Sequence, residues 1–321
     1  MDFLTLAQGN LGSPMVLCFM LGLGAALLRA DLSIPEQAAR MMSIYLLFAI
    51  GMKGGVEITR AGLGPEILLD LGVGIALSFL LPVIAFAVMR LATGLSSVDA
   101  AAAAGHYGSI SIVTFVAATQ ALYSMGLAYS GHMVAVAAAM EAPAILMALW
   151  LAIRSGASSK SAPMREILLN GSIVLLCGAL VVGFISGPSG MESVSAFLIE
   201  PFKGVLCLFL LDMGLLAGRH LRGSRGAIGP AVLAFGLYMP LIGATVGALF
   251  GWATDMPAGD MALLITLSAS ASYIAAPAAL RIALPEANPA IYLTLSLGLT
   301  FPFNLTVGIP TYVAIAEFLS S

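Results

Sequence analysis

Stretches of apolar residues long enough to cross a lipid bilayer follow one another along almost the whole chain. A spanning helix needs about 20 mostly apolar residues. Of the 321 residues, 60% are hydrophobic and only 9% are charged. Soluble domains carry roughly 25% charged residues, so the composition excludes a water-soluble fold. We predict an all-α polytopic membrane protein with about ten transmembrane helices, near residues 11–28, 37–52, 66–91, 98–123, 131–153, 166–187, 194–217, 227–252, 259–281 and 288–318.

Several features limit the class of function. The net charge is only −3 and no basic run follows the chain, which argues against a nucleic-acid partner. The three cysteines, Cys18, Cys177 and Cys207, lie in apolar stretches too far apart for a metal site, and we expect buried, unpaired thiols. No cofactor is predicted. The first ten residues lack the basic region of a signal peptide, so the stretch after them is interpreted as the first span.

The basic residues predict the orientation, because loops on the inner side of a membrane carry an excess of lysine and arginine. With the N-terminus outside, 10 of the 13 basic residues fall inside and 3 outside, so both termini are predicted to face outward across a cell (inner) membrane. The inner set is Arg29, Arg40, Arg90, Arg154, Lys160, Arg165, Arg219, Arg222, Arg225 and Arg281; the outer set is Lys53, Arg60 and Lys203.

Two halves of the chain resemble each other. We predict a first repeat over residues 1–155, a short cytoplasmic connector over 156–165, and a second repeat over 166–321. Each half contains an odd number of spans, so the copies would sit in opposite orientations. Chance similarity between apolar segments is the alternative. The matching segments are 50–52 with 213–215, 109–111 with 270–272, and 141–143 with 300–302.

One pair of matching segments interrupts its apolar stretches with small and hydroxyl-bearing residues. The first runs from Gly105 to Ser111 and the second from Ser268 to Tyr273. Irregular backbone survives at membrane depth only inside protein or against a water-filled cavity, and paired broken helices indicate the binding site of a secondary transporter. Free amides at a restarting helix can bind an anion. The alternative is that small residues simply allow helices to cross closely.

Charged side chains inside spans are costly and so indicate function. Glu141 lies beside Pro143, whose ring removes a backbone hydrogen bond and frees a carbonyl. These oxygens, with Thr300 and Asn304 in the matching segment, suit a hard cation such as sodium; a proton relay and a structural ion pair remain alternatives. Asp212 is ambiguous. Asp70 and His132 lie near span ends, where we expect them to reach the membrane interface. The last span contains Pro302 and Pro310 and is expected to be kinked or split.

His106 and Ser109 are one helical turn apart, which raises the remote alternative of an intramembrane serine hydrolase. The second interruption contains no histidine, so we expect no enzyme. His106 and Tyr107, together with Asp212, are instead interpreted as cavity or gating residues.

The chain resembles the sodium-dependent bicarbonate transporter family, best known from cyanobacteria, over nearly its whole length. The most specific stretches are residues 50–58, 105–111 and 270–302. The resemblance implies broken, crossing fourth and ninth helices, a gate domain of helices 1, 2, 6 and 7, a core domain of helices 3–5 and 8–10, and a homotrimer. It also implies bicarbonate between the broken helices and sodium beside it. The implied anion site is Gly108, Ser109, Ile110, Ser111, Ser270, Ala271, Ser272 and Tyr273; the implied sodium ligands are Glu141, Thr114, Thr300 and Asn304.

Two departures from the family pattern bear on function. Cyanobacterial members have an acidic residue where this chain has Tyr273, and they have a long insertion where this chain has a short connector. The missing insertion argues against regulation by a nucleotide-sensing signalling protein. Our leading hypothesis is sodium-coupled symport of a small anion, bicarbonate first. The alternative is a sodium- or proton-coupled carrier of an organic acid, similar to the bile-acid symporters, with Tyr107, Phe115 and Tyr273 lining a less polar cavity.

Overall fold

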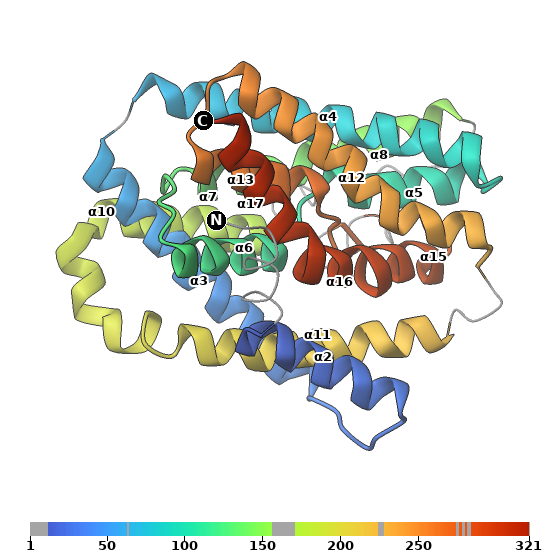
Figure 1. Ribbon diagram of the computed structural model, residues 1–321, viewed down its shortest axis with the longest axis horizontal. Helices are drawn as coiled ribbons and strands as arrows, with labels where there is room; N and C mark the ends of the chain where they lie inside the picture. Colours follow the sequence, from blue (N-terminus) through green and yellow to red (C-terminus); the bar gives the residue numbers. More distant parts are fainter. Residues whose placement is uncertain are drawn as a thin grey trace.

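The computed structural model describes residues 12–62, 64–155, 171–223, 228–273, 276–277, 280 and 284–320, and all regular structure within these ranges is helical (Figure 1). The predicted helical membrane fold is therefore confirmed. In chain order the helices are α2 (Pro14–Leu27), α3 (Glu36–Ala61), α4 (Pro65–Ala92), α5 (Ser97–Gly108), α6 (Ile112–Met125), α7 (Met133–Ala139), α8 (Glu141–Arg154), α10 (Gly171–Leu198), α11 (Phe202–Gly223), α12 (Pro230–Ala253), α13 (Ala258–Ala269), α15 (Pro289–Leu293), α16 (Phe301–Phe303) and α17 (Ile309–Leu319).

Eight helical segments of the described chain are long and apolar enough to cross a membrane. Two shorter apolar helices, α2 and α13, fall in the first and ninth predicted spans. Every predicted span thus contains helix, and the number of ten crossings stays a prediction. The predicted connector and the predicted positions of both termini lie outside the described residues.

Gly187 was expected to end a span, and its backbone is non-helical (φ 60°, ψ −164°), so α10 consists of two helices that meet at a kink at this residue. A glycine accepts this positive φ at no steric cost because it has no Cβ. The expectation for the cysteines is wrong in part. The three cysteines are unpaired, but Cys177 is exposed and Cys18 and Cys207 are half-buried. An exposed apolar side chain is expected on a helix that faces lipid.

The last predicted span is one continuous helix rather than two. Between α15 and α17 its backbone stays right-handed through two π-helical segments, Thr294–Thr300 and Asn304–Gly308. Pro302 and Pro310 cannot donate the backbone hydrogen bond that an α-helix requires, and prolines and π-helical turns are both recognised causes of a bend in a helix. The span is therefore not split, whereas the expected kink stays a prediction.

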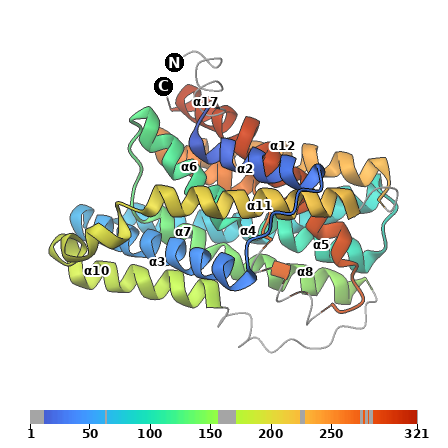
Figure 2. The same ribbon diagram turned by 90° about the horizontal axis from the view of Figure 1, so that it is seen from below.

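The helices fall into two groups that meet along the length of the molecule. In Figure 1, α2, α3, α10 and α11 lie together below and to the left, whereas α4, α5, α8 and α12 lie above and to the right. In the turned view, α10, α11 and α12 all run roughly along the long axis (Figure 2). The first group contains the helices of the predicted gate and the second contains four helices of the predicted core, and the division into domains stays a prediction.

Glycines allow very close packing inside the first group. A Cβ on Gly55 of α3 would lie 2.0 Å from the Leu180 carbonyl oxygen of α10. A Cβ on Gly214 of α11 would lie 2.1 Å from the Phe19 carbonyl oxygen of α2. Both contacts are with backbone, which cannot move aside as a side chain can. Small residues at such crossings are typical of membrane helices.

The helix pairings follow the order that an inverted repeat predicts. In the predicted scheme α3 and α11 are the second helices of the two halves, and α2 and α10 are the first helices. The structure pairs α3 with α10 and α11 with α2, so each second helix packs on the other half's first helix. Likewise α4 packs on α5, and α12 packs on α13. The pattern supports the repeat, which remains a hypothesis.

Candidate functional site

The first broken helix runs through the centre of the protein. The most apolar window of the α5–α6 segment is 94% buried, against 28% for the α10 segment at the periphery. α5 ends at Gly108, Ser109 is extended, and α6 begins at Ile112. Gly108 is required at this point, because an added Cβ would lie 2.2 Å from Cγ of Pro82 on α4. A chain break at bilayer depth is thus held entirely inside protein, as the sequence predicts.

Ser111 caps the restarted helix. Its hydroxyl oxygen accepts hydrogen bonds from the Thr114 amide at 3.2 Å and from Thr114 Oγ1 at 2.9 Å. Such a cap satisfies one of the amides that a helix cannot pair internally. The next first-turn amides, those of Ile112 and Val113, have no partner within the helix by the same rule. The N-terminus of α6 is therefore the positive end of a helix dipole, and it lies at the break.

The second broken helix stops beside the first. α13 ends at Ala269, and Ser270 adopts an extended conformation as its C-cap. The Ser270 hydroxyl accepts a hydrogen bond from the Ser111 amide at 2.9 Å and donates one to the Leu267 carbonyl at 2.8 Å. The Ser272 amide donates to the carbonyls of His106 and Ser109, at 2.7 and 3.1 Å. The two breaks are thus joined directly by hydrogen bonds across more than 150 residues of sequence.

His106 and Ser109 present unused polar atoms at this crossing. Both residues are 0% exposed. Nδ1 of His106 lies 2.5 Å from the Ser272 carbonyl oxygen. Because a carbonyl only accepts, Nδ1 carries the proton and Nε2 of a neutral ring is an acceptor. Among the described residues, neither His106 Nε2 nor Ser109 Oγ has a hydrogen-bond partner. An unsatisfied buried polar group costs about 1–3 kcal/mol, so this pair indicates a place for a polar ligand.

The side chains expected to bind sodium do not all lie at the crossing. Thr114 is bonded to Ser111, as described above. Thr300 accepts a hydrogen bond from the Tyr107 hydroxyl at 2.7 Å and donates one to the Gly236 carbonyl at 2.7 Å. Thr300 thereby fixes the Tyr107 ring, and a cation would have to share its hydroxyl oxygen with these bonds.

Asn304 is similarly engaged. Its amide nitrogen donates to the Ala269 carbonyl at 2.9 Å, and its amide oxygen accepts from the Tyr312 hydroxyl at 2.7 Å. The side chain therefore secures the last turn of α13 at the point where that helix breaks. The oxygen retains one lone pair for a further contact.

Two carboxylates inside spans are buried. Glu141 is the first residue of α8 and is 6% exposed, and Asp212 of α11 is also 6% exposed. Among the described residues, no hydrogen bond or ion pair reaches either carboxylate or joins Glu141 to the other predicted sodium ligands. The carbonyl of Met140, just before Glu141, accepts a hydrogen bond from Ser78 of α4. This bond holds the start of α8 against α4.

An open cavity lies between the two helix groups. It has a volume of about 270 Å³ and is lined by residues of α3, α6, α10 and α11. A second cavity of about 180 Å³ shares Ile50 and Lys53 with it and reaches Phe115, one turn beyond Ser111 on α6. The two cavities also share Glu57, Tyr123 and Tyr129, so they adjoin each other.

The larger cavity collects basic side chains. Lys53, Arg60 and Lys203, the three residues predicted to face outward, all line it. Arg60 is paired with Glu57 at 2.7 Å, whereas Lys53 and Lys203 lie over the Tyr123 ring, with their nitrogens 6.0 and 4.8 Å from its centroid. A cavity with excess positive charge raises the local concentration of anions.

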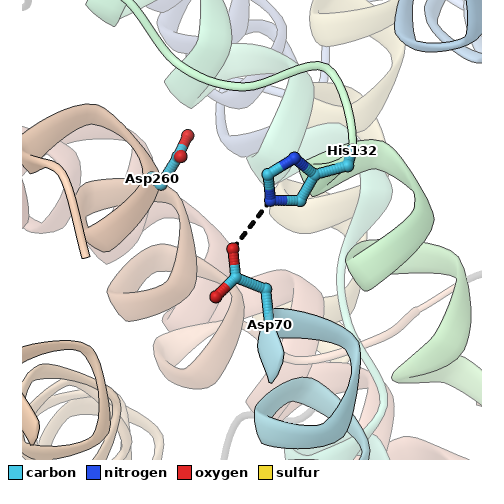
Figure 3. A group of neighbouring side chains, drawn as sticks. All are labelled: Asp70, His132 and Asp260. Atoms are coloured by element: carbon cyan, nitrogen blue, oxygen red, sulfur yellow. Dashed lines mark hydrogen bonds and ion pairs between the residues drawn. The ribbon is translucent and has the colours of Figure 1, made fainter. Parts of the chain in front are cut away.

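The sequence analysis missed one polar cluster. Asp70 and His132 were expected at the interface, but they are 5% and 7% exposed. Asp70 Oδ2 lies 2.7 Å from His132 Nε2, and Asp260 of α13 is adjacent (Figure 3). Both residues lie near helix ends, as expected, but packing of α13 against α4 and α7 buries their side chains in protein, so they do not reach water or lipid. No local pattern in the sequence links the three positions.

An all-helical protein with membrane-spanning segments and a buried pair of joined helix breaks belongs to the class of polytopic membrane proteins. The family model of the Na⁺-dependent bicarbonate transporter superfamily matches residues 14–317, nearly the whole chain. The chain is therefore a member of this superfamily, as the resemblance in its sequence predicted. A search of individually curated proteins returned no significant match.

Proposed function

We propose that this protein is a sodium-coupled carrier that binds a small oxyanion, bicarbonate first, at the crossing of its two broken helices. The observation that carries the proposal is the pair of unpartnered buried atoms, His106 Nε2 and Ser109 Oγ. A bound ligand would relieve the cost of leaving both atoms without hydrogen bonds.

The chemistry of these atoms favours a protonated oxyanion. Nε2 of a neutral imidazole is an acceptor, and the Ser109 hydroxyl can donate. Bicarbonate carries one O–H donor and two charge-bearing acceptor oxygens, so its chemistry matches both kinds of group. A simple carboxylate lacks the donor and would leave Nε2 unpaired. This difference supports bicarbonate over an organic acid.

The positive end of α6 supplies attraction without a fixed charge. The first-turn amides of Ile112 and Val113 lack helical partners and lie beside Ser111 at the break. Such an end acts as roughly half a positive charge. An anion held this way is released more readily than one bound by arginine, which suits a carrier that must both bind and unload.

Sodium is the coupling ion in this scheme, and Glu141 is its most direct partner. A buried carboxylate without a cationic neighbour among the described residues is costly unless a proton or a cation neutralises it. Sodium bound near Glu141 would lower the net negative charge of the core and so favour anion binding. Coupling of this kind is typically worth about 1–3 kcal/mol.

The test is uptake of labelled bicarbonate into proteoliposomes with and without an inward sodium gradient. We expect uptake that depends on the gradient, is strongly reduced in Ser109→Ala, and loses its sodium dependence in Glu141→Gln. Glu57→Gln, a substitution in the outer cavity, serves as the folded control that retains coupling. Sodium-independent flux in the wild-type protein would contradict the coupling. Stronger competition by pyruvate than by unlabelled bicarbonate would indicate that the substrate is an organic acid.

A further inference from the structure

Three buried side chains with metal-binding atoms converge from three separate segments. Asp70 comes from α4, His132 immediately precedes α7, and Asp260 lies in the first turn of α13 (Figure 3). They are 5%, 7% and 2% exposed. One ligand atom from each lies within 4.8 Å of the other two. The cluster is separate from the crossing and takes no part in the proposed transport chemistry.

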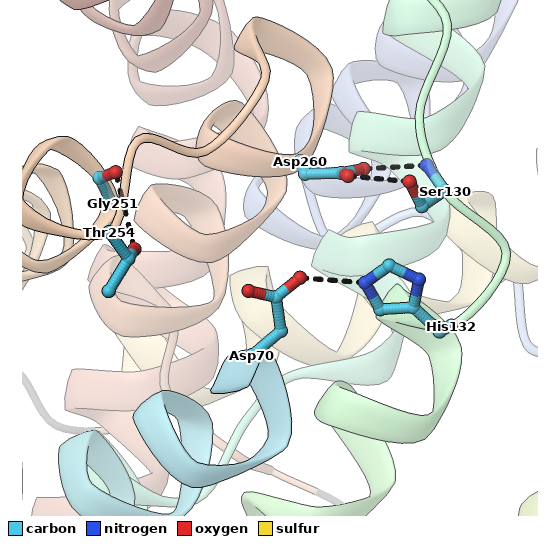
Figure 4. Close-up of polar contacts among 6 residues, drawn as sticks. All are labelled: Asp70, Ser130, His132, Gly251, Thr254 and Asp260. Carbon is cyan, nitrogen blue, oxygen red and sulfur yellow. Dashed lines mark hydrogen bonds and ion pairs between the residues drawn. The ribbon is translucent and has the colours of Figure 1, made fainter. Parts of the chain in front are cut away.

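The surrounding hydrogen bonds hold these side chains in place but leave one oxygen unused. The two oxygens of Asp260 accept from the amide and the hydroxyl of Ser130, each at 2.6 Å (Figure 4). Oδ2 of Asp70 is bonded to His132 at 2.7 Å. Within the described part of the chain, Oδ1 of Asp70 has no hydrogen-bond partner, although the side chain is only 7% exposed. This oxygen is not fully enclosed, and its lone pairs are free to bind a ligand.

The charge of the cluster also requires compensation. Two carboxylates flank one imidazole, and the only ion pairs among the described residues are Arg60 with Glu57 and His132 with Asp70. No lysine or arginine therefore neutralises Asp260 within that part of the chain. If the imidazole is neutral, as metal binding requires, the two carboxylates carry a charge that one divalent cation would cancel completely.

We propose that Asp70, His132 and Asp260 bind a divalent transition-metal ion of the zinc class. One imidazole nitrogen with two carboxylate oxygens is a donor set that zinc accepts, with a fourth position left for water. Ligand bonds of 2.0–2.2 Å place the donors of a tetrahedral site about 3.4 Å apart. The cluster must therefore contract overall, while the hydrogen bond between Asp70 and His132 is replaced by bonds from both residues to the metal, with the proton of His132 Nε2 released to solvent.

Such a site would connect three segments at one end of the protein. With the predicted orientation, the start of α4, the turn before α7 and the start of α13 all lie at the outer surface. The ion would fix the turn containing Ser130 and His132 against α4 and against the outer half of the second broken helix. It would stabilise this end of the molecule independently of any transported ion.

The experiment measures Zn²⁺ binding to the purified full-length chain in detergent, after chelator treatment and removal of any affinity tag. A background with Cys18→Ser, Cys177→Ser and Cys207→Ser removes the thiols as competing ligands. We expect one ion per protomer, measured by competition with a chromophoric chelator. Asp70→Asn and Asp260→Asn should each weaken the affinity by about tenfold or more. His220→Gln, a substitution in the last turn of α11, should leave the Zn²⁺ affinity unchanged.

A spectroscopic variant keeps the proposal testable where an aspartate substitution impairs folding. In the same background, Co²⁺ should give the visible bands of a four-coordinate site. His132→Cys should add a sulfur-to-cobalt charge-transfer band, which a purely structural histidine would not produce. Folded protein that binds no Zn²⁺, unchanged affinity in both aspartate variants, or absence of the charge-transfer band would each overturn the assignment.

Discussion

Ser109 and Ser270 occupy matching positions in the sequence but have different surroundings in the structure. Ser270 accepts from the Ser111 amide and donates to the Leu267 carbonyl, so its hydroxyl is fully used in joining the two breaks. The Ser109 hydroxyl is equally buried and has no partner among the described residues. The first serine is therefore available to a ligand, whereas the second maintains the crossing.

This difference predicts opposite effects of the same substitution. Ser109→Ala removes an unsatisfied group, so the melting temperature of the detergent-purified protein should stay the same or rise while bicarbonate uptake falls. Ser270→Ala leaves the Ser111 amide unpaired and should cost about 1–3 kcal/mol of stability. Fluorescence-detected thermal unfolding beside uptake in proteoliposomes checks both. Equal destabilisation by the two substitutions would contradict the assignment of separate roles.

The residues of the breaks could be predicted from sequence, but most of their contacts could not. Glycine and serine in the middle of an apolar stretch are a local signal, and they correctly indicated the positions at which α5 and α13 end. The bonds made by Thr300 and Asn304 depend on which helix lies opposite, and no pattern along one segment contains that information. The clustering of Asp70, His132 and Asp260 escaped prediction for the same reason.

At the scale of the elements, tightly packed glycine faces determine which helices pair. Gly55 and Gly183 bring α3 and α10 into contact through their backbones, since an added Cβ at either would lie 2.0 or 2.1 Å from a carbonyl oxygen of the other helix. The sequence predicted the helices from hydropathy alone. It did not predict their partners, because glycine is also common where it only bends a chain, as at Gly187.

We predict that Gly55→Ala separates α3 from α10 and destabilises the protein by about 1–3 kcal/mol, the usual cost of overpacking. Gly178 is a matched control within α10, because nothing lies within 4 Å of the Cβ it would acquire. Gly178→Ala should therefore leave the melting temperature unchanged. Similar melting temperatures for both variants would show that the close contact has no energetic importance.

At the scale of the whole molecule, the predicted orientation and the larger cavity involve the same basic residues. The three basic residues predicted to lie outside line one cavity between the two helix groups. Because that cavity carries excess positive charge, it would gather anions before they reach the crossing. In this interpretation the structure corresponds to a state that is open toward the outer side.

Cysteine labelling in intact cells tests this orientation. In the cysteine-free background, Lys53→Cys should react with a membrane-impermeant maleimide added outside. Arg90→Cys, at the exposed end of α4, should react only after the membrane is permeabilised. The reverse labelling pattern would mean that the protein has the opposite orientation in the membrane and that the cavity faces the cytoplasm.

The hydrogen bonds that join the two breaks have a mechanical consequence. Ser111 is bonded to Ser270, and Ser272 is bonded to His106 and Ser109, so the walls of the site come from both halves of the chain and are fastened to each other. A continuous pore through this point would require those bonds to separate. We therefore expect the site to move together with its bound ligand rather than to open as a pore, so the protein should carry one load per cycle and conduct no currents of the size that open channels carry.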